Sequence, residues 1–414
     1  MYKTIYLRKG KEESLLRYHP WIFSGAIQRM DDGLEEGEVV RVLTSSGDYI
    51  ATGHYQQGSI TVRVLTFSDV EIDDRFWYSR LSSALSMRQA IGIADSADNN
   101  TYRLVHGEGD LLPGLIIDVY GQTAVMQAHS IGMHLNRKAI ALQLMEVMGD
   151  RLQHVYYKSE TTLSFMDPEN GFLIGGSKDN VAVENGLKFC VDWLKGQKTG
   201  FFVDQRENRS LLERYAKGRR VLNMFCYTGG FSVYAMRGGA SLVHSVDSSA
   251  KAIELTRQNV EMNFPNDPRH EAFCDDAFKF LERVAPLSSP EGDTNVLKSN
   301  EAPSEAVGGA SYNLIILDPP AFAKHRGALH NALKGYTRLN QKAFEKIEKG
   351  GILFTFSCSQ VVTKDHFRNA VFTAAAQAHR KVRILHQLHQ PADHPVNIYH
   401  PEGEYLKGLV LYVE

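Results

Sequence analysis

Two apolar segments that end abruptly at polar residues constrain the fold of this chain more than any other feature. The first runs through residues 314–317 and ends at Asp318, which two prolines follow; the second runs through residues 351–357 and ends at Cys358. Apolar runs of this kind are typical of strands buried on both faces of a parallel α/β sheet. Because ligands bind outside the carboxyl ends of such strands, neighbouring strands would bring Asp318 and Cys358 to one cleft.

Alternating strands and helices around these segments predict a mostly parallel, doubly wound sheet. The predicted strands are residues 186–193, 241–247 and 271–276 and one that starts at residue 221, and the predicted helices are 250–263, 329–348 and 363–379. Segments 381–388 and 406–413 are expected to form an antiparallel pair at the edge of this sheet. Residues 288–311 are rich in Pro, Gly, Ser and Asn without periodicity, and they predict an inserted loop.

Residues 1–70 predict a small β-barrel, since short alternating segments at 4–7, 38–43, 49–53 and 59–65 are separated by turn-forming residues. Arg17, His19 and Trp21 precede the second of these segments. Basic side chains around an aromatic ring are suited to hold a nucleic-acid backbone while the ring stacks on a base. The alternative is that Trp21 anchors the core beside a solvated basic edge.

Residues 71–184 predict a helical connector at 70–92 and a central α+β domain. A strand, a glycine-rich turn and a second strand span residues 102–118, followed by a helix near 134–148 and strands near 153–157 and 172–175. His106, Glu108 and Asp110 alternate within the glycine-rich turn. We interpret them as turn-forming, solvated residues and expect no metal there.

Composition narrows the class of protein further. The chain has 414 residues, 43% of them hydrophobic and 23% charged, which is enough to bury cores in several domains. Its four cysteines lie singly, without the spacing of a zinc site or a disulfide framework, so we expect no disulfide and no structural metal. No segment approaches about 18 apolar residues and the start lacks a signal-peptide layout, so we expect a cytoplasmic protein without a membrane partner. The net charge of -2 gives no overall sign of a nucleic-acid partner, so nucleic-acid binding would depend on local basic patches.

The turns that follow the first strands of the predicted parallel sheet narrow the class of cofactor. Gly229 and Gly230 lack the Gly-x-Gly-x-x-Gly spacing of a dinucleotide site, and the chain has no phosphate-binding Gly-x-x-x-x-Gly-Lys-Ser/Thr loop. Asp247 and Asp276 close the next two strands, where carboxylates can accept hydrogen bonds from a ribose diol and an exocyclic amine. This pattern favours a nucleoside without a phosphate chain, such as S-adenosylmethionine. The alternative is that these aspartates only cap the helices that follow.

A cysteine and a carboxylate at adjacent strand ends suggest a specific methyl transfer. Carbon 5 of a pyrimidine is a poor nucleophile, but a thiolate that adds to carbon 6 makes the ring enolate-like and reactive. Cys358 and Asp318 supply the thiol and the acid that this chemistry needs. The alternative is that Cys358 is a small core residue, as single cysteines usually are.

Several motifs also resemble one known family. They are Leu222-Asn-Met-Phe-Cys-Tyr-Thr-Gly-Gly-Phe-Ser-Val233, Leu317-Asp-Pro-Pro-Ala-Phe322, Gly335-Tyr-x-x-Leu-Asn340, Thr355-Phe-Ser-Cys-Ser359, Ala392-Asp-His-Pro-Val396 and Tyr399-x-Pro-Glu-Gly-x-Tyr-Leu-Lys-Gly408. Together they resemble the bacterial large-subunit ribosomal RNA cytosine-C5 methyltransferases. Residues 21–25 are similar to the family's amino-terminal PUA domain and residues 103–115 to its central domain, so the resemblance runs nearly end to end.

The resemblance implies a class I Rossmann-like methyltransferase sheet in residues 185–414, S-adenosylmethionine as cofactor and large-subunit ribosomal RNA as partner. It implies that Cys358 is the nucleophile and that Asp318 contacts the target base. Arg17, His19 and Trp21 are the expected RNA contacts. The residues expected at the cofactor are Gln197, Thr199, Asp204, Arg206, Phe225, Tyr227, Gly229, Asp247, Asp276 and Asp318.

Two departures and two alternatives remain at this stage. The loop at 288–311 is longer than is usual in the family, and no second cysteine lies near Asp318, so the base that removes the carbon 5 proton is unassigned. The same sheet could methylate a guanine nitrogen with Cys358 merely packed. The chain could also be a non-catalytic ribosome-assembly factor that binds RNA. The target nucleotide and the oligomeric state, a homodimer included, stay open.

Overall fold

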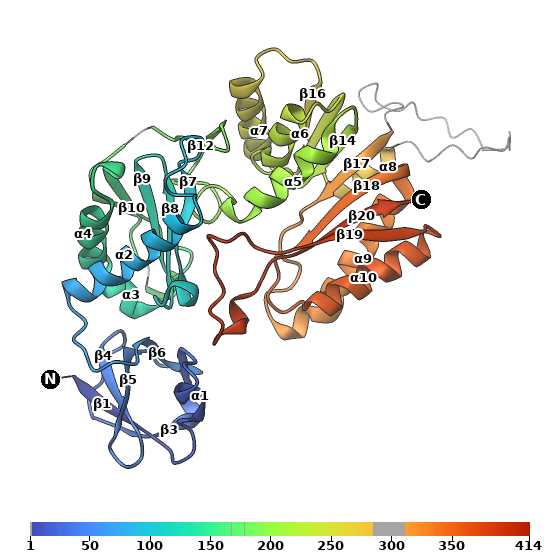
Figure 1. The fold of residues 1–414 in the computed structure, drawn as a ribbon. Helices are drawn as coiled ribbons and strands as arrows, with labels where there is room; N and C mark the ends of the chain where they lie inside the picture. Colours follow the sequence, from blue (N-terminus) through green and yellow to red (C-terminus); the bar gives the residue numbers. More distant parts are fainter. Residues whose placement is uncertain (1, 167, 178, 285–310) are drawn as a thin grey trace, which may run out of the picture. The chain divides into compact units, whose positions relative to one another are not determined.

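The computed structural model describes residues 2–166, 168–177, 179–284 and 311–414, and the chain forms two compact units. The first unit comprises residues 1–186, 191–204 and 391–403, and the second comprises 187–190, 205–390 and 404–414. Figure 1 shows the elements of each unit. The inserted loop predicted at residues 288–311 lies outside the described residues, apart from Ser311.

The amino-terminal part of the first unit is a six-stranded sheet in the order β2-β6-β5-β4-β1-β3. Its elements are β1 (Lys3–Leu7), α1 (Glu13–Leu16), β2 (Trp21–Phe23), β3 (Ile27–Met30), β4 (Val39–Leu43), β5 (Tyr49–Tyr55) and β6 (Ile60–Thr66). Alternate side chains such as Val40, Val42, Val62 and Val64 fill one apolar core. The small β domain predicted from the alternating pattern is confirmed, with the short strands β2 and β3 as elements that the pattern missed.

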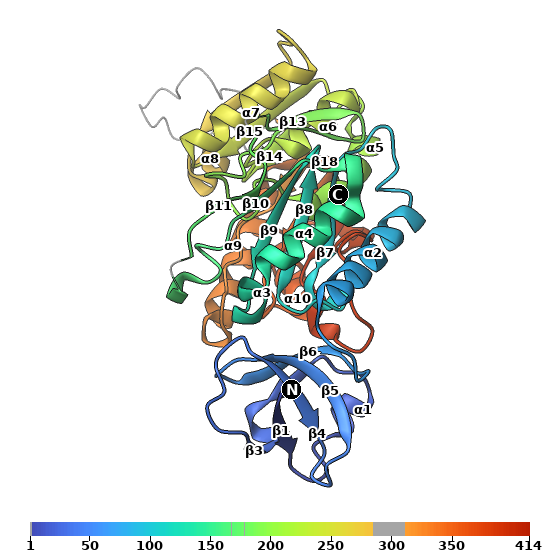
Figure 2. The same cartoon turned by 90° about the vertical axis from the view of Figure 1, so that its left-hand side faces the viewer.

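A second sheet of the first unit has five strands in the order β11-β10-β9-β8-β7, and helices α2 and α4 cover one of its faces (Figure 2). The elements are α2 (Asp74–Ala90), β7 (Thr101–His106), β8 (Leu115–Tyr120), β9 (Thr123–Ala128), α3 (Ile131–Leu135), α4 (Arg137–Met148), β10 (His154–Tyr157) and β11 (Gly171–Ile174). Strand β12 (Val181–Glu184) follows them in the chain and lies outside this sheet. Asp73 caps α2 by accepting a hydrogen bond from the Phe76 backbone N–H at 2.9 Å.

A buried ion network joins the segment 391–403 to this second sheet. The Arg88 side chain is fully buried and forms an ion pair with Asp110, with Nη2 donating to Asp110 Oδ2 at 2.8 Å and to the Asp393 carbonyl at 2.7 Å. The Arg103 backbone N–H donates to Asp393 Oδ2 at 3.0 Å. The interpretation of Asp110 as a solvated turn residue is therefore wrong, because a buried guanidinium requires a buried counter-charge.

The second unit is built on a seven-stranded sheet in the order β16-β15-β14-β17-β18-β20-β19. Its strands are β14 (Arg220–Met224), β15 (Leu242–Asp247), β16 (His270–Cys274), β17 (Tyr312–Leu317), β18 (Ile347–Ser357), β19 (Val382–Leu388) and β20 (Lys407–Val413), and β13 (Leu187–Cys190) lies outside this sheet. Strands β14 to β18 pair in parallel, whereas β20 pairs antiparallel with both β18 and β19. The doubly wound sheet and its antiparallel edge pair are confirmed.

Helices cover both faces of this sheet (Figure 1). They are α5 (Arg206–Ala216), α6 (Gly230–Arg237) and α7 (Ala250–Asn263) on one face and α8 (Ala277–Arg283), α9 (Leu329–Lys346) and α10 (Lys364–Gln377) on the other. The second group closes a large apolar core with Phe280, Tyr336 and Phe344 fully buried. None of the helices in the described part of the chain combines the length and the apolar character needed to cross a bilayer.

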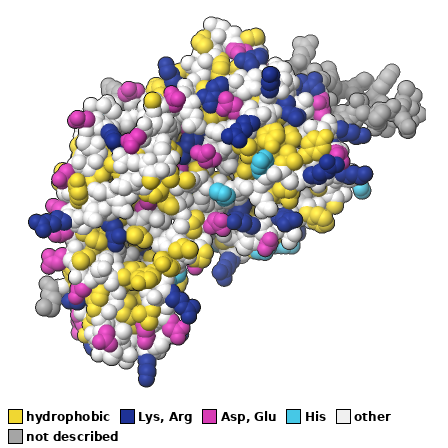
Figure 3. Space-filling view, viewed as in Figure 1, with side chains coloured by type: hydrophobic (Ala, Val, Ile, Leu, Met, Phe, Trp, Pro, Cys, Tyr) yellow, Lys and Arg dark blue, Asp and Glu magenta, His cyan; other side chains and the backbone are white. Residues whose placement is uncertain are grey.

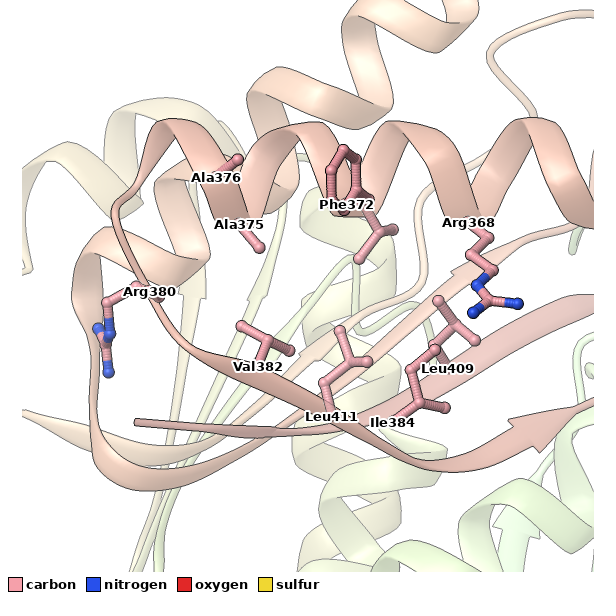
Figure 4. Close-up of a pocket in the computed structure, with 10 residues that line it drawn as sticks. Arg368, Phe372, Ala375, Ala376, Arg380, Val382, Ile384, Leu409 and Leu411 are labelled. Carbon is pink, nitrogen blue, oxygen red and sulfur yellow. The ribbon is translucent and has the colours of Figure 1, made fainter.

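An apolar groove lies between α10 and the edge strands β19 and β20 (Figure 4). Phe372 on the helix and Ile384, Leu409 and Leu411 on the strands contribute to its lining, with Arg368 among the few polar members. None of the site residues expected from the sequence lines this groove. The candidate site lies instead at the carboxyl ends of the parallel strands.

Candidate active site

Three neighbouring strands bring three of the expected residues to one edge of the second unit's sheet. Met224 of β14 pairs with Val246 of β15 on one side and with Leu317 of β17 on the other. The residues that follow these three are Phe225, Asp247 and Asp318. Adjacent strands lie about 4.8 Å apart, so the sheet itself places these residues side by side. The structure thus places these three residues at one edge of the sheet, and their role at the cofactor stays a prediction.

The turn after β14 has an unusual backbone. Phe225, Tyr227 and Gly229 all adopt positive φ angles, of 57°, 48° and 76°. Non-glycine residues rarely adopt this conformation, and strained turns concentrate at functional sites. The turn is held by Asp247, whose Oδ2 accepts a hydrogen bond from the Tyr227 backbone N–H at 3.0 Å. A ligand at this edge can therefore approach backbone atoms closely.

A glycine is required at position 229 both by the backbone conformation and by the lack of space for a side chain. A Cβ atom added there would lie 2.7 Å from Thr256 Cγ2, and the φ of 76° disfavours any other residue. The close packing of α6 against α7 at this point keeps the turn tight. No side chain at Gly229 then obstructs the edge of the sheet.

Asp247 and Asp276 differ in their structural roles. Ser249, rather than Asp247, caps α7. Asp276 caps α8, and its Oδ1 accepts hydrogen bonds from the backbone N–H groups of Phe278 and Lys279, both at 3.0 Å. Asp276 therefore caps a helix and Asp247 does not, and a cofactor role stays a prediction for both. Both carboxylates still follow neighbouring strands, β15 and β16.

Asp318 is oriented by a chain of two amides. Asn208 Nδ2 donates to Gln205 Oε1 at 2.6 Å, and Gln205 Nε2 donates to Asp318 Oδ2 at 3.0 Å. The first bond fixes which end of the Gln205 amide faces Asp318. A donor aimed at the carboxylate stabilises its ionised form, so Asp318 is set up as a hydrogen-bond acceptor.

The turn that carries Cys358 is held on both sides. Ser357 Oγ donates to the Tyr336 hydroxyl at 2.9 Å, and Ser359 Oγ donates to the Ala323 carbonyl at 2.6 Å. Burial raises the pKa of Tyr336 to about 12, so this phenol keeps its proton at neutral pH. Cys358 itself is partly buried and directly follows β18, the neighbour of the Asp318 strand.

The other three cysteines have environments that differ from that of Cys358. Cys190 and Cys226 are buried, and burial raises the pKa of the Cys226 thiol to about 12. Cys274 is exposed at the end of β16. None of the four cysteines, all of which the structure describes, forms a disulfide. A thiol in an apolar interior is unreactive, so Cys190 and Cys226 are unsuited to nucleophilic chemistry.

Lys407 is a site residue that the sequence reasoning missed. It opens β20, pairs with Ser357 across the antiparallel ladder and is only 5% exposed. Its Nζ donates to the Ser359 carbonyl at 2.5 Å, which places an ammonium group against the Cys358 turn. Burial lowers the pKa of Lys407 to about 8, while the charge of Cys358 acts in the opposite direction. The available signal was a lysine at the start of an otherwise apolar strand.

The remaining residues expected at the cofactor are divided between the two units. Gln197, Thr199 and Asp204 belong to the first unit, whereas Arg206 begins α5 in the second and is buried. The Thr199 hydroxyl donates to Asp118 Oδ2 at 2.6 Å, Gln197 is exposed, and Asp204 is buried 3.6 Å from Lys198 Nζ. The structure thus shows a packing role for Thr199 within the first unit, and a cofactor role stays a prediction.

The expected RNA contacts occupy one region of the first unit. Arg17 is exposed, whereas His19 and Trp21 are partly buried, and Trp21 Nε1 donates to Glu108 Oε1 at 2.8 Å. Trp21 therefore has a structural partner. On the face drawn in Figure 3, basic and acidic side chains are interspersed, without a stripe of one sign. Recognition of RNA by these residues remains a prediction.

The edge of the second unit's sheet fits a nucleoside-bearing cofactor. At this edge, the strained turn after β14 lets a ligand come close to the backbone, and carboxylates lie at the ends of β15 and β16. Residues 152–291 match the family of S-adenosylmethionine-dependent methyltransferases, and residues 5–67 match a PUA-like domain. Over the full length of both chains, the structure resembles a candidate S-adenosylmethionine-dependent methyltransferase from Streptococcus mutans (TM-score 0.80, 22% identity) and a candidate methyltransferase complexed with SAH (TM-score 0.81, 22% identity). The protein is thus an S-adenosylmethionine-dependent methyltransferase with a PUA-like domain.

Relatives that match over their full length show to which family this chain belongs. The chain is 39% identical to ribosomal RNA large subunit methyltransferase I of Tolumonas auensis over 99% of both chains. It is 37% identical to the protein of the same name from Erwinia tasmaniensis over 98% of both. The chain belongs to the ribosomal RNA large subunit methyltransferase I family.

The position of Lys407 predicts that it promotes the thiolate form of Cys358. We expect Lys407→Met to slow alkylation of Cys358 by iodoacetamide at pH 7 by about tenfold, since loss of about 1.4 kcal/mol of charge interaction corresponds to a tenfold effect. The lysine is charged below its pKa of about 8, so the difference between wild type and variant should shrink above that pH. Mass spectrometry of the Cys358 peptide provides the rate.

Two controls make this measurement specific. The exposed thiol of Cys274 is an internal reference whose alkylation rate should not change. Lys381→Met removes an exposed lysine just before β19, and it should leave Cys358 reactivity unchanged. Equal Cys358 rates in wild type and Lys407→Met from pH 6 to 9 would show that Lys407 has no such role.

Proposed function

We propose that this enzyme methylates carbon 5 of a cytidine in large-subunit ribosomal RNA, with Cys358 as the nucleophile. The observation that carries the proposal is the placement of Cys358 and Asp318 directly after adjacent parallel strands, β18 and β17, at the edge where Phe225 and Asp247 also lie. The names of the full-length relatives support the substrate class, because these proteins are large-subunit ribosomal RNA methyltransferases.

The proposed chemistry follows from the residues at this edge. The Cys358 thiolate adds to carbon 6 of the cytosine, and the electrons of the carbon 5–carbon 6 double bond make carbon 5 nucleophilic. Bound S-adenosylmethionine supplies the electrophilic methyl group. A base then takes the carbon 5 proton, and the electrons of that C–H bond reform the double bond and expel the thiolate. Cys358 is thus regenerated in each cycle.

Asp318 and Lys407 have complementary roles in this proposal. Gln205 orients Asp318 by donating to Oδ2, and the carboxylate is suited to accept a hydrogen bond from the exocyclic amine of the cytosine. The Lys407 ammonium lies against the Cys358 turn and favours the thiolate both before addition and after its release. Tyr336 and Ser357 keep the turn fixed, which preserves the direction of attack.

Access to carbon 5 requires the cytidine to leave the base stack, at a cost of a few kcal/mol in a duplex and less in a loop. A domain that holds the flanking RNA can offset this cost. The β domain at residues 5–67, with its similarity to PUA-like domains, is our candidate for that role.

The covalent step can be tested directly. We expect Cys358→Ala to lower methyl transfer from labelled S-adenosylmethionine to undermodified ribosomal RNA by at least about a thousandfold, because carbon 5 is not activated without the thiolate. Mass analysis of the product nucleosides should show 5-methylcytidine with the wild type. Cys274→Ala, which removes an exposed thiol, should retain full activity. A Cys358→Ala enzyme that keeps its rate, or a methylguanosine product, would favour the guanine alternative.

Asp247 provides a test of the cofactor-binding edge. We expect Asp247→Asn to weaken S-adenosylmethionine binding at least about tenfold, because a charged acceptor for the ribose hydroxyls is lost and the Tyr227 turn loses a charge-assisted bond. Isothermal titration calorimetry measures the affinity. Glu254→Gln changes an exposed carboxylate on the neighbouring helix α7 and should bind as the wild type does. Unchanged affinity in Asp247→Asn would place the cofactor elsewhere.

The RNA surface can be tested at Arg17, the most exposed of the three expected contacts. If Arg17 binds a phosphate, Arg17→Ala should lower RNA affinity and reduce the slope of log affinity against log salt by about 0.7 to 1. The exposed Lys217 at the end of α5 provides the control Lys217→Ala. Filter binding at several salt concentrations measures both quantities, and an unchanged slope would exclude this contact.

A further inference from the structure

Three potential metal ligands meet within the first unit, far from the strand ends of the methyl-transfer site in sequence. His19 lies two residues before β2 in the amino-terminal β domain, whereas His400 and Glu402 lie in the segment 391–403. About 380 residues separate the two parts of the chain. The His400 ring packs against Trp21, with ring centroids 4.3 Å apart, and this contact brings the three side chains together.

The donor atoms are spaced as ligands of one ion would be. His19 Nε2 lies 3.7 Å from Glu402 Oε1, and His400 Nε2 lies 3.8 Å from Glu402 Oε2. One ligand atom from each residue lies within 4.8 Å of the other two. Donors that share an ion at about 2.0–2.2 Å are at most about 4.4 Å apart, so small side-chain adjustments complete the set.

His400 lacks a hydrogen-bond partner although it is buried. Its side chain is only 3% exposed, and within the described part of the chain neither Nδ1 nor Nε2 makes a hydrogen bond. An unsatisfied buried polar group costs about 1–3 kcal/mol, so such groups call for a specific explanation.

We propose that His19, His400 and Glu402 bind a divalent transition-metal ion. Two imidazoles and one carboxylate suit Zn²⁺, with Co²⁺ and Ni²⁺ as close substitutes, and water completes the coordination. The ion would satisfy the buried His400 ring and tie the segment 391–403 to the amino-terminal β domain. Its role is structural, because the three ligands bridge two distant parts of the chain.

The surroundings of the ligands fit this proposal. The Trp21 backbone N–H donates to His19 Nδ1 at 3.2 Å, and the Trp21 carbonyl lies 3.3 Å from the same nitrogen, so both contacts to the ring are made at Nδ1 and Nε2 faces Glu402. Glu108 accepts a hydrogen bond from Trp21 Nε1 and lies close enough to act on the charge of His400. A second carboxylate beside the cluster adds negative charge that favours a cation.

The full-length protein, freed of metal with a chelator, provides the test. We expect it to bind one equivalent of Zn²⁺ by calorimetry and one of Co²⁺ by visible absorption, without the intense thiolate band that cysteine ligands would give. Glu402→Gln and His19→Asn should each weaken Zn²⁺ binding at least about tenfold. Glu404→Gln, two residues from a ligand and paired with Lys364, should bind as the wild type does. Saturating Zn²⁺ should raise the thermal midpoint of the wild type but not that of Glu402→Gln.

Three results would overturn the proposal. The first is no binding, or binding only at millimolar Zn²⁺. The second is equal affinity in the wild type, Glu402→Gln and His19→Asn, which would place the ion elsewhere. The third is a Co²⁺ spectrum with thiolate charge transfer, which would assign the ion to a cysteine. Glu402 is about half exposed and its replacement preserves the buried rings, so Glu402→Gln remains informative where a substitution at His400 disrupts folding.

Discussion

The parallel pairing of β14 with β15 on one side and β17 on the other is the constraint on which the methyl-transfer site depends. In the chain, β14 is the first strand of this sheet, and the later strands β15 and β17 lie on its two sides. The order of strands therefore reverses at β14, and ligands of open α/β sheets bind at such a switch point. Hydrogen-bond register then aligns Phe225, Asp247 and Asp318 on three adjacent strands. No side-chain interaction is needed to bring them together, because the backbone ladder does so.

The strained turn and the oriented carboxylate show how this edge is fixed. The left-handed conformations of Phe225 and Tyr227 carry a conformational cost, and Asp247 offsets part of it by binding the Tyr227 N–H. Asp318 is held in the same way by the amides of Gln205 and Asn208. Each acid therefore has an orientation set before any ligand arrives, which reduces the entropy that binding must overcome.

The sequence predicted the parts of this structure that follow from local patterns. Apolar runs that end at polar residues located β17 and β18, and the alternation of strands and helices predicted the doubly wound sheet. The pattern failed where a distant partner decides the role of a residue. Asp110 was interpreted as solvated, but a fully buried Arg88 lies opposite it. His19 and His400 have no spacing signal at all, because only the return of residues 391–403 to the first unit brings them together.

Lys407 shows why the direction of the last strands matters. Parallel strands deliver their carboxyl ends to the active edge, so residues near their amino ends lie at the opposite edge. Strand β20 runs antiparallel to β18, and its first residue therefore lies beside Ser357, at the end of β18. Burial of a lysine there lowers its pKa, and a negative charge on the adjacent Cys358 would act in the opposite direction. In an all-parallel sheet, the first residue of this strand would instead lie at the edge away from the thiol. The reversal of β20 thus links a feature of topology to the reactivity of the proposed nucleophile.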